Sequence, residues 1–424
     1  MNILWITNIL FPDICKEIGR KIPVTGGWMK SLAEALTTTY PDVNLSVAAL
    51  YGDKKNTLLK KKIKNITYYC LPFYEFETAY NPNMETVWKE VHAQCNPDVV
   101  HIHGTEYPYG LAYLRANGVK HVVVSLQGLV SVYARYSLGQ IPNQTLQHYR
   151  TFYDYIKGNI LKTPEIMEKQ GKLEIEYIST VKHVIGRTEW DKAHVWAINS
   201  QCKYHFCNEI LRSPFYEEQY QWSLQACEQH SIFLSQAYKP IKGIHKVIEA
   251  LPIILHHYPN TKVYVAGNNF MNTTELRDKL KFSTYANYIK HLIEQKNITN
   301  CFHFTGVLNE RQMAERYRSA HVFICPSSIE NSPNSLGEAQ ILGVPCIASY
   351  VGGVPDMIQH GQTGLLYRFE EYEMLAAAVC RIFEDNELAT HISKTEKKEA
   401  ALRHNKQINA ANTYQIYKDI INEI

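Results

Sequence analysis

The chain is 424 residues long, which exceeds what one ordinary hydrophobic core holds, so its length predicts two domains of roughly 200 residues each. Apolar residues make up 45% of the chain and charged residues 20%, a globular mixture that can bury a core in each half. The formal net charge of +3 is too small to favour nucleic acid or an acidic polymer as a partner.

Neither a targeting segment nor a disulfide framework is expected. The residues from Met1 to Ile6 lack the basic start and long apolar run of a signal peptide, and no run of about 18 apolar residues predicts a membrane span. The ten cysteines form no Cys-x-x-Cys pair, and the closest two, Cys202 and Cys207, have no second pair nearby for zinc. We therefore expect a cytoplasmic protein with reduced thiols.

The first half alternates strands and helices. Residues 2–10 predict a buried strand, and residues 28–39 predict a helix with Leu32, Ala35 and Leu36 on one side. Short β-branched runs predict further buried strands of a parallel sheet, at residues 98–103, 121–126 and 183–185.

The second half repeats this alternation after a polar stretch that contains Pro214. We place the first domain at residues 1–212, a linker at 213–230, the second domain at 231–405 and a final helix in 406–424. The pattern predicts two doubly wound domains, with ligands in a cleft at the carboxyl ends of their strands. The strands expected here cover residues 231–235, 262–267, 321–326 and 345–349, and the helices cover 244–257, 310–319, 333–342 and 372–383.

The most informative segment runs from His321 to Gly353, where residues 327–332 form a loop that joins a strand to a helix. Ser332 is expected to cap this helix, Pro333 to be its first residue and Gly343 to end it. A helix N-terminus presents backbone N–H groups that favour an anion such as a diphosphate. These groups belong here to Asn334, Ser335 and Leu336.

Two glutamates flank this predicted anion site. Glu338 lies about one turn inside the helix, where a carboxylate can accept hydrogen bonds from a ribose diol. Glu330 precedes the helix on the sugar side of the phosphates, where a carboxylate can hold sugar hydroxyls. The alternative is a solvated Glu330 and a Glu338 on the helix surface. The ligand interpretation is preferred because strand, cap, helix and glycine stop agree.

The whole segment resembles the retaining family 4 glycosyltransferases. It carries their E-x7-E motif from Glu330 to Glu338, followed by Gly343-Val-Pro-Cys-Ile-Ala-Ser and Gly352-Gly-Val-Pro. Asp356 stands where that family usually has glutamate. The resemblance implies an α/β GT-B fold, with two Rossmann-like doubly wound domains facing a central cleft. It assigns the acceptor to the first domain and the nucleotide-sugar to the second, with the final helix crossing back to the first.

The resemblance also identifies residues at other loops of the second domain. Lys242 matches a family lysine that contacts the donor diphosphate, and it would stabilise the charge on the leaving group. Gln236 replaces the family arginine six residues earlier, so it can donate a hydrogen bond but supplies no charge. A surface lysine is the alternative for Lys242. Loops that resemble those cradling base and ribose carry Gly267, Asn268, Val307 and Leu308, for which plain strand-end turns are the alternative.

In the first domain, the resemblance implies contacts to both substrates. Gly26 and Gly27 would let the backbone approach the donor phosphates, and a flexible turn is the alternative for this pair. Gln127 stands where the family has a histidine near the transferred sugar, so we expect it to bind hydroxyls and not to act as a base. His103 and Arg187 are the acceptor-side candidates, with a structural histidine as the alternative for His103.

The expected reaction is metal-independent and needs no cofactor. The chain contains no Asp-x-Asp pair to hold a divalent ion, so the helix N-terminus and Lys242 would take over that electrostatic role. The resemblance implies retention of anomeric configuration through an oxocarbenium-like state. We expect transfer from a nucleotide-diphosphate sugar to a glycan or lipid-linked saccharide in cell-surface polysaccharide synthesis of a bacterium. A nucleotide-sugar 2-epimerase and a non-catalytic nucleotide-sugar binder are the alternatives.

A basic run predicts peripheral contact with anionic lipids at the inner face of the membrane. A solvated loop or strand edge is the other interpretation. The run consists of Lys54, Lys55, Lys60, Lys61, Lys62 and Lys64.

Overall fold

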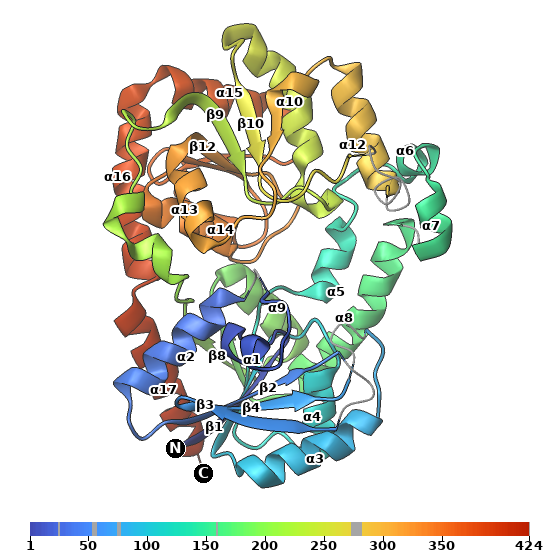
Figure 1. The fold of residues 1–424 in the computed structure, drawn as a ribbon, viewed down its shortest axis with the longest axis vertical. Helices are drawn as coiled ribbons and strands as arrows, with labels where there is room; N and C mark the ends of the chain where they lie inside the picture. Colours follow the sequence, from blue (N-terminus) through green and yellow to red (C-terminus); the bar gives the residue numbers. More distant parts are fainter. Residues whose placement is uncertain (24–25, 53–56, 74–77, 158–159, 273–281, 424) are drawn as a thin grey trace. The chain divides into compact units, whose positions relative to one another are not determined.

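The computed structural model describes residues 1–23, 26–52, 57–73, 78–157, 160–272 and 282–423. The chain forms two compact units, each with its own sheet (Figure 1). The first unit comprises Met1–Val132, Met167–Arg212 and Arg403–Ile424, and the second comprises Tyr133–Ile166 and Ser213–Leu402.

The first unit is built on an eight-stranded sheet in the order β3-β4-β2-β1-β5-β6-β7-β8. All neighbouring strands are parallel except β3 and β4, which are antiparallel. Every residue of β5 is buried, so both faces of the sheet are covered there. The strands are β1 (Asn2–Thr7), β2 (Asn44–Leu50), β3 (Leu59–Ile63), β4 (Ile66–Leu71), β5 (Val99–His103), β6 (Val122–Ser125), β7 (His183–Gly186) and β8 (Lys203–Phe206).

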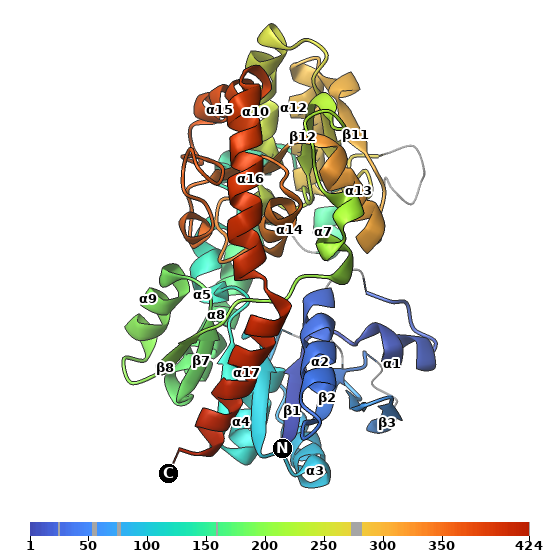
Figure 2. The ribbon, with the colours of Figure 1, turned by 90° about the vertical axis from the view of Figure 1, so that its left-hand side faces the viewer.

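The C-terminal helix α17 (Lys406–Ile421) packs beside α2 (Gly27–Thr39) in the first unit, as Figure 2 shows. Its Tyr417 is fully buried, and the hydroxyl accepts a hydrogen bond of 2.9 Å from the indole N–H of Trp5 on β1. The other helices of this unit are α1 (Pro12–Glu17), α3 (Asn83–Cys95), α4 (Tyr109–Asn117), α5 (Val130–Tyr133), α9 (Glu189–Ile198) and most of α8 (Thr163–Thr180).

The second unit contains a six-stranded parallel sheet in the order β11-β10-β9-β12-β13-β14. Its central strand β12 is buried along its whole length, as an apolar run covered on both faces should be. The strands are β9 (Glu228–Leu234), β10 (Lys262–Val265), β11 (Phe302–Phe304), β12 (Ala320–Cys325), β13 (Cys346–Ser349) and β14 (Leu365–Tyr367).

Besides its strands, the second unit contains α-helices and short 3-10 turns. The α-helices are α6 (Asn143–His148), α7 (Phe152–Lys157), α10 (Ile244–His257), α12 (Thr284–Gln295), α13 (Glu310–Ser319), α14 (Asn334–Leu342), α15 (Tyr372–Glu384) and α16 (Asn386–Arg403). The 3-10 turns among the described residues of both units are η1 (Ala134–Tyr136), η2 (Ile160–Lys162), η3 (Ser213–Tyr216), η4 (Glu218–Tyr220), η5 (Pro240–Lys242), η6 (Thr299–Cys301) and η7 (Val354–Asp356).

The division of the chain differs from the expected continuous domains at two places. Tyr133–Ile166 lies inside the expected first domain, 1–212, but it groups with the second unit. The expected linker, 213–230, is also packed into the second unit. The reason for the latter is Trp222, whose indole N–H donates to the carbonyl of Ala320 at 2.8 Å and whose backbone N–H donates to Leu342 at 2.9 Å.

Within the described ranges, the helices are all too short or too polar to traverse a lipid bilayer.

Candidate functional site

Lys242 and Glu330 meet at the carboxyl edge of the second sheet. The Lys242 Nζ lies 2.5 Å from Glu330 Oε1, and the Ser327 hydroxyl donates to the same oxygen at 2.7 Å. Burial lowers the pKa of Lys242, but the charge and hydrogen bond of Glu330 outweigh this and raise it overall. The lysine is therefore a cation held in one position by a buried carboxylate.

Close backbone approaches fix the loops that carry this pair. Gly243 has a φ of +70°, and a Cβ added there would overlap the carbonyl oxygen of Pro326. Gly352 has a φ of +52°, and its added Cβ would overlap the carbonyl oxygen of Glu330. That oxygen also accepts a hydrogen bond of 3.0 Å from the Gly353 N–H. Only glycine fits such left-handed, closely packed positions, so the loops after β9, β12 and β13 form one rigid structure.

The helix after Glu330 begins one residue later than expected. Pro333 has an extended ψ of 120° and flanks α14, whose first residue is Asn334. Ser332 does not cap the helix, because its hydroxyl points to the Met357 sulfur at 3.5 Å. The Leu336 N–H, expected to face a ligand, donates instead to the Pro333 carbonyl at 3.0 Å and closes the first turn.

Four other predicted donor contacts lie at the same edge of the sheet. Asn334 and Ser335 occupy the first turn of α14 and are half-buried. Glu338 lies one turn further along and is buried. Gln236 follows β9 on the same loop as Lys242, and it is exposed. All are at the carboxyl edge of the sheet, where a parallel sheet binds its ligands.

The loops predicted to cradle base and ribose meet at the ends of β10 and β11. Gly267 pairs with Gly306 through an N–H to carbonyl hydrogen bond of 2.9 Å. Asn268 and Val307 are exposed beside this pair, and Leu308 is half-buried. The two strand ends are thus joined, and the side chains of Asn268 and Val307 face solvent.

In the first unit, Gly26 and Gly27 open α2. Gly26 is the residue before the helix, with a φ of +78°, and an added Cβ would lie 2.8 Å from Ile9 Cδ1. Gly27 is the first helical residue. Glycine is therefore required at position 26 by conformation and by packing.

His103 ends β5 inside an aromatic cluster. Its ring lies 4.5 Å from Trp5, 5.6 Å from Trp28 and 3.8 Å from His101, measured between ring centroids. Burial, with a smaller contribution from His101, holds the pKa of His103 well below its ordinary value. Neither ring nitrogen has a hydrogen-bond partner among the described residues. His103 is thus a neutral, buried histidine with two unused polar atoms.

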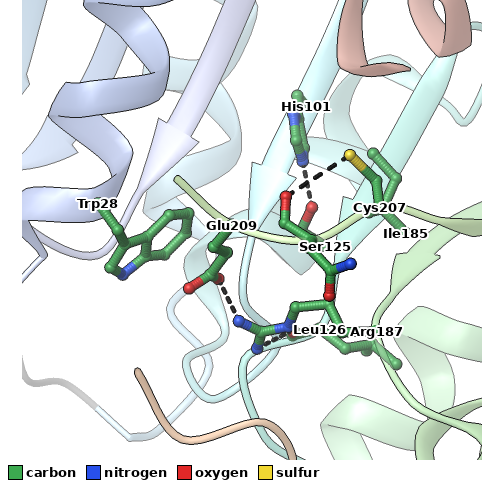
Figure 3. Close-up of a pocket in the computed structure, with 9 residues that line it drawn as sticks. Trp28, His101, Ser125, Leu126, Ile185, Arg187, Cys207 and Glu209 are labelled. Atoms are coloured by element: carbon green, nitrogen blue, oxygen red, sulfur yellow. Dashed lines mark hydrogen bonds and ion pairs between the residues drawn. The ribbon is translucent and has the colours of Figure 1, made fainter. Parts of the chain in front are cut away.

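Arg187 lines a pocket in the first unit, shown in Figure 3. One guanidinium nitrogen lies 2.5 Å from Glu209 Oε1, and another donates to the carbonyls of Leu126 and Gln127 at 3.0 and 3.3 Å. The Gln127 side-chain nitrogen has no partner within the described structure. The pocket is lined by Trp28, His101, Ser125, Leu126, Ile185, Arg187, Cys207, Asn208 and Glu209.

The charge of Arg187 is therefore already balanced, and this residue holds the loop that carries Gln127. Sequence reasoning missed the partner, Glu209, because only the folded chain brings it from beyond β8 to the end of β7. It also missed Glu106. Burial and the nearby Glu174 raise the pKa of Glu106 to about 7. The one signal for Glu106 was its place three residues after His103 in a strand-end loop.

The basic run is partly engaged within the first unit. Lys61 forms an ion pair of 2.6 Å with Glu17, and the Lys60 ammonium lies 5.2 Å from the centre of the Tyr69 ring. Lys54 and Lys55 lie outside the described residues. Contact with a membrane remains a prediction.

Across the described ranges, no three His, Cys, Asp or Glu side chains gather in a way that suits a metal ion. Metal independence remains a prediction, because a divalent ion can also arrive bound to a substrate phosphate.

Comparison with known proteins finds a family model that matches part of the second unit. Residues 218–399 match the family model described as "Glycosyl transferases group 1". The chain is 25% identical over 185 residues to spore coat protein SA of Bacillus subtilis (strain 168), which covers 42% of this chain and 46% of that protein. It is 25% identical over 182 residues to the capsular polysaccharide biosynthesis glycosyltransferase CapM of Staphylococcus aureus, covering 43% and 44%. The chain spans about half the length of these curated relatives.

Solved structures extend the likeness over the whole chain. Sucrose-phosphate synthase from Thermosynechococcus elongatus superposes with a TM-score of 0.72 at 17% identity, covering 99% of this chain and 98% of that one. Anabaena Alr3699/HepE in complex with UDP-glucose gives 0.65 at 15% identity, covering 98% and 99%. These likenesses confirm the expected GT-B fold class, with two parallel-sheet α/β units.

Proposed function

Since residues 218–399 match the family model of the group 1 glycosyl transferases, we propose that this protein is a retaining, metal-independent glycosyltransferase. It moves a sugar from a nucleotide-diphosphate sugar to a glycan or lipid-linked saccharide. The donor binds the second unit, and the acceptor binds the pocket-bearing edge of the first sheet near His103.

The observation that carries the proposal is the Lys242–Glu330 pair beside the N-terminus of α14. The ammonium and the helix terminus both favour an anion, and Glu330 holds the ammonium in place before any ligand arrives. A diphosphate brings its own negative charge to this point. Preorganised positive charge of this kind stabilises a leaving group without reorganisation during the reaction.

The proposed chemistry follows from these groups. The bond between the sugar anomeric carbon and the diphosphate oxygen breaks, and the acceptor oxygen attacks the same face through an oxocarbenium-like state. The hydroxyl proton passes to the leaving diphosphate. Lys242 stabilises the growing phosphate charge, Glu330 and Gln127 hold sugar hydroxyls, and Glu338 holds the ribose diol.

Two comparisons support the substrate class. The CapM relative is named for capsular polysaccharide biosynthesis, and the HepE structure contains UDP-glucose. Both are consistent with a nucleotide-sugar donor and a glycan product for this chain.

A panel of nucleotide-sugars, screened first by thermal shift and then with saccharide acceptors, tests the proposal. We expect one donor to raise the melting temperature and to be consumed with an acceptor in the presence of EDTA. NMR of the product should show the anomeric configuration of the donor. Inverted product or loss of activity restored by metal would refute the mechanism. Interconversion of the free nucleotide-sugar would indicate an epimerase, and binding without turnover a non-catalytic binder.

A further inference from the structure

A short segment from the first half of the sequence lies against both loops that carry the Lys242–Glu330 pair. Residues 133–141, which we call the strap, belong to the second unit. We propose that the strap positions Lys242 and Glu330, and that Ser328 and His245 are the positioning residues through which it acts. This proposal rests on the proposed function and adds residues that touch neither sugar nor phosphate.

Ser328 joins three backbone segments. Its hydroxyl donates to the Tyr136 carbonyl of the strap at 2.9 Å, and its backbone N–H donates to the Ile241 carbonyl at 2.9 Å. Ser328 is two residues from Glu330, and Ile241 is adjacent to Lys242. Because Ser328 is 2% exposed, water does not compete for these bonds. One serine thus links the strap to the backbone beside both charged side chains.

His245 makes the second link. Its Nε2 lies 2.9 Å from the Gly139 carbonyl of the strap. Burial lowers the pKa of His245 to about 3, so the ring is neutral, and a carbonyl partner requires the proton to be on Nε2. Its Nδ1 faces the Tyr285 hydroxyl at 3.5 Å. His245 follows Lys242 by three residues, on the first turn of α10.

The strap and the lysine loop also touch backbone to backbone. Gly139 has a φ of +60°, and an added Cβ would collide with the carbonyl oxygen of Pro240. Pro240 begins the 3-10 turn that ends at Lys242. On its other side, this turn is pressed against Pro326 through Gly243. The loop of Lys242 is therefore held from two sides, by the strap and by the loop of Glu330.

This arrangement restricts the backbone from which a long side chain extends. Lysine has several freely rotating bonds, so its ammonium position depends on a fixed backbone and on Glu330. A displacement of about 1 Å at a reacting centre can cost on the order of a hundredfold in rate. Loosening the strap should therefore slow the chemical step more than it weakens donor binding.

Four variants test this inference. Ser328→Ala and His245→Leu remove the two donors to the strap, and His245→Gln restores a donor to the Gly139 carbonyl. Thr261→Val is the matched control, because this buried hydroxyl also bonds a carbonyl, that of Tyr258 at 2.7 Å, at the opposite edge of the same sheet. The kcat, the donor KM and the melting temperature of each variant are measured.

We expect Ser328→Ala and His245→Leu to lower kcat at least about tenfold, with donor KM changed less than about threefold. His245→Gln should recover most of the kcat, and Thr261→Val should lose stability without losing kcat. Equal loss in the Leu and Gln variants, or kcat that follows melting temperature in all four, would overturn the strap's role.

Transfer by the unmodified protein is measured first, so a failure of the proposed function is seen separately. In that event the affinity for UDP, measured by calorimetry, replaces kcat. About twofold to threefold weaker binding by Ser328→Ala and His245→Leu, recovered in His245→Gln and absent from Thr261→Val, supports positioning of Lys242. Unchanged affinity in all four variants rejects it.

Discussion

At the residue scale, Lys242 and Glu330 form an ion pair across 88 positions of sequence. Glu330 is buried and the lysine side chain is 24% exposed, so the pair is shielded from most of the solvent. Removing one partner of such a pair leaves the other charge uncompensated, which is costly. The two residues therefore depend on one another in both stability and function.

Glu330→Gln should remove most of the transfer activity while the protein stays folded. The amide keeps a hydrogen-bonding group but loses the charge that holds Lys242, and we expect kcat to fall on the order of a hundredfold. Initial rates with the best donor measure this. Glu228→Gln is the control, because Glu228 also pairs with a lysine, Lys262, at an exposed site on β9. Equal rates for wild type and Glu330→Gln would contradict the assigned role.

Glu396 on α16 is a second buried carboxyl, with no described role in the site. It is fully buried, and neither oxygen has a hydrogen-bond partner in the described structure. Burial raises the pKa of Glu396 well above its ordinary value. The folded state therefore retains a proton that the unfolded chain releases above about pH 4.5, so this group destabilises the fold as pH rises from there toward the folded pKa.

Glu396→Gln should thus gain stability over wild type by up to about 1.4 kcal/mol for each pH unit above pH 5. Urea unfolding at pH 5, 6 and 7 measures the difference in the free energy of unfolding. The exposed Glu399 on the same helix provides the control, since Glu399→Gln should show no such trend. A stability difference that does not change with pH would show that Glu396 is not held protonated.

The sequence predicted some of these residues and not others, for a physical reason. Lys242 and Glu330 were predicted because each stands in a local sequence motif, Lys242 in a strand-loop and Glu330 in a loop before a helix. Glu209 and Glu396 were not, because the ion pair of Glu209 with Arg187 and the burial of Glu396 arise only in the tertiary structure. Arg187 was predicted as a ligand contact, but its engagement by Glu209 required the structure.

At the scale of elements, the bounds of helices could be predicted from the periodicity of apolar residues, but the contacts between elements could not. The helices expected at residues 244–257 and 310–319 have the same bounds as α10 and α13. The first turn of α14 was misjudged by one residue, because Pro333 takes an extended ψ instead of a helical one. The strap was not predicted at all, since its bonds reach residues about 100 to 190 positions away.

Gly243→Ala tests whether the junction of two loops requires glycine. A methyl group would combine left-handed strain with overlap on Pro326, and we expect a loss of at least about 3 kcal/mol in unfolding free energy. Gly361→Ala is the control, because Gly361 has a φ of +78° but open space around it, so strain alone should cost about 1 kcal/mol. Equal losses in the two variants would mean that the close approach contributes nothing.

At the scale of the whole molecule, neither unit is one continuous stretch of sequence. The first unit is assembled from three segments and the second from two. Alternating strands and helices were enough to predict two parallel-sheet units. They did not predict which unit receives Tyr133–Ile166, because that choice depends on contacts such as Ser328 with Tyr136.

Two units with separate sheets should unfold in two calorimetric transitions, which a ligand and a mutation can move independently. UDP should raise only the transition of the second unit. Tyr417→Phe should lower only that of the first, because Trp5 loses the acceptor of its indole N–H and His101 loses a hydroxyl 2.6 Å from its Nδ1. With about 1–3 kcal/mol lost, the shift should be roughly 2 to 12 °C.

Tyr414→Phe provides the control on the same helix, since the Tyr414 hydroxyl bonds Asp42 at an exposed site and its loss should move neither transition by more than about 1 °C. If Tyr417→Phe lowered both transitions together, α17 would have to stabilise the second unit as well. The placement of residues 403–424 with the first unit would then be an incomplete account of how the chain is held together.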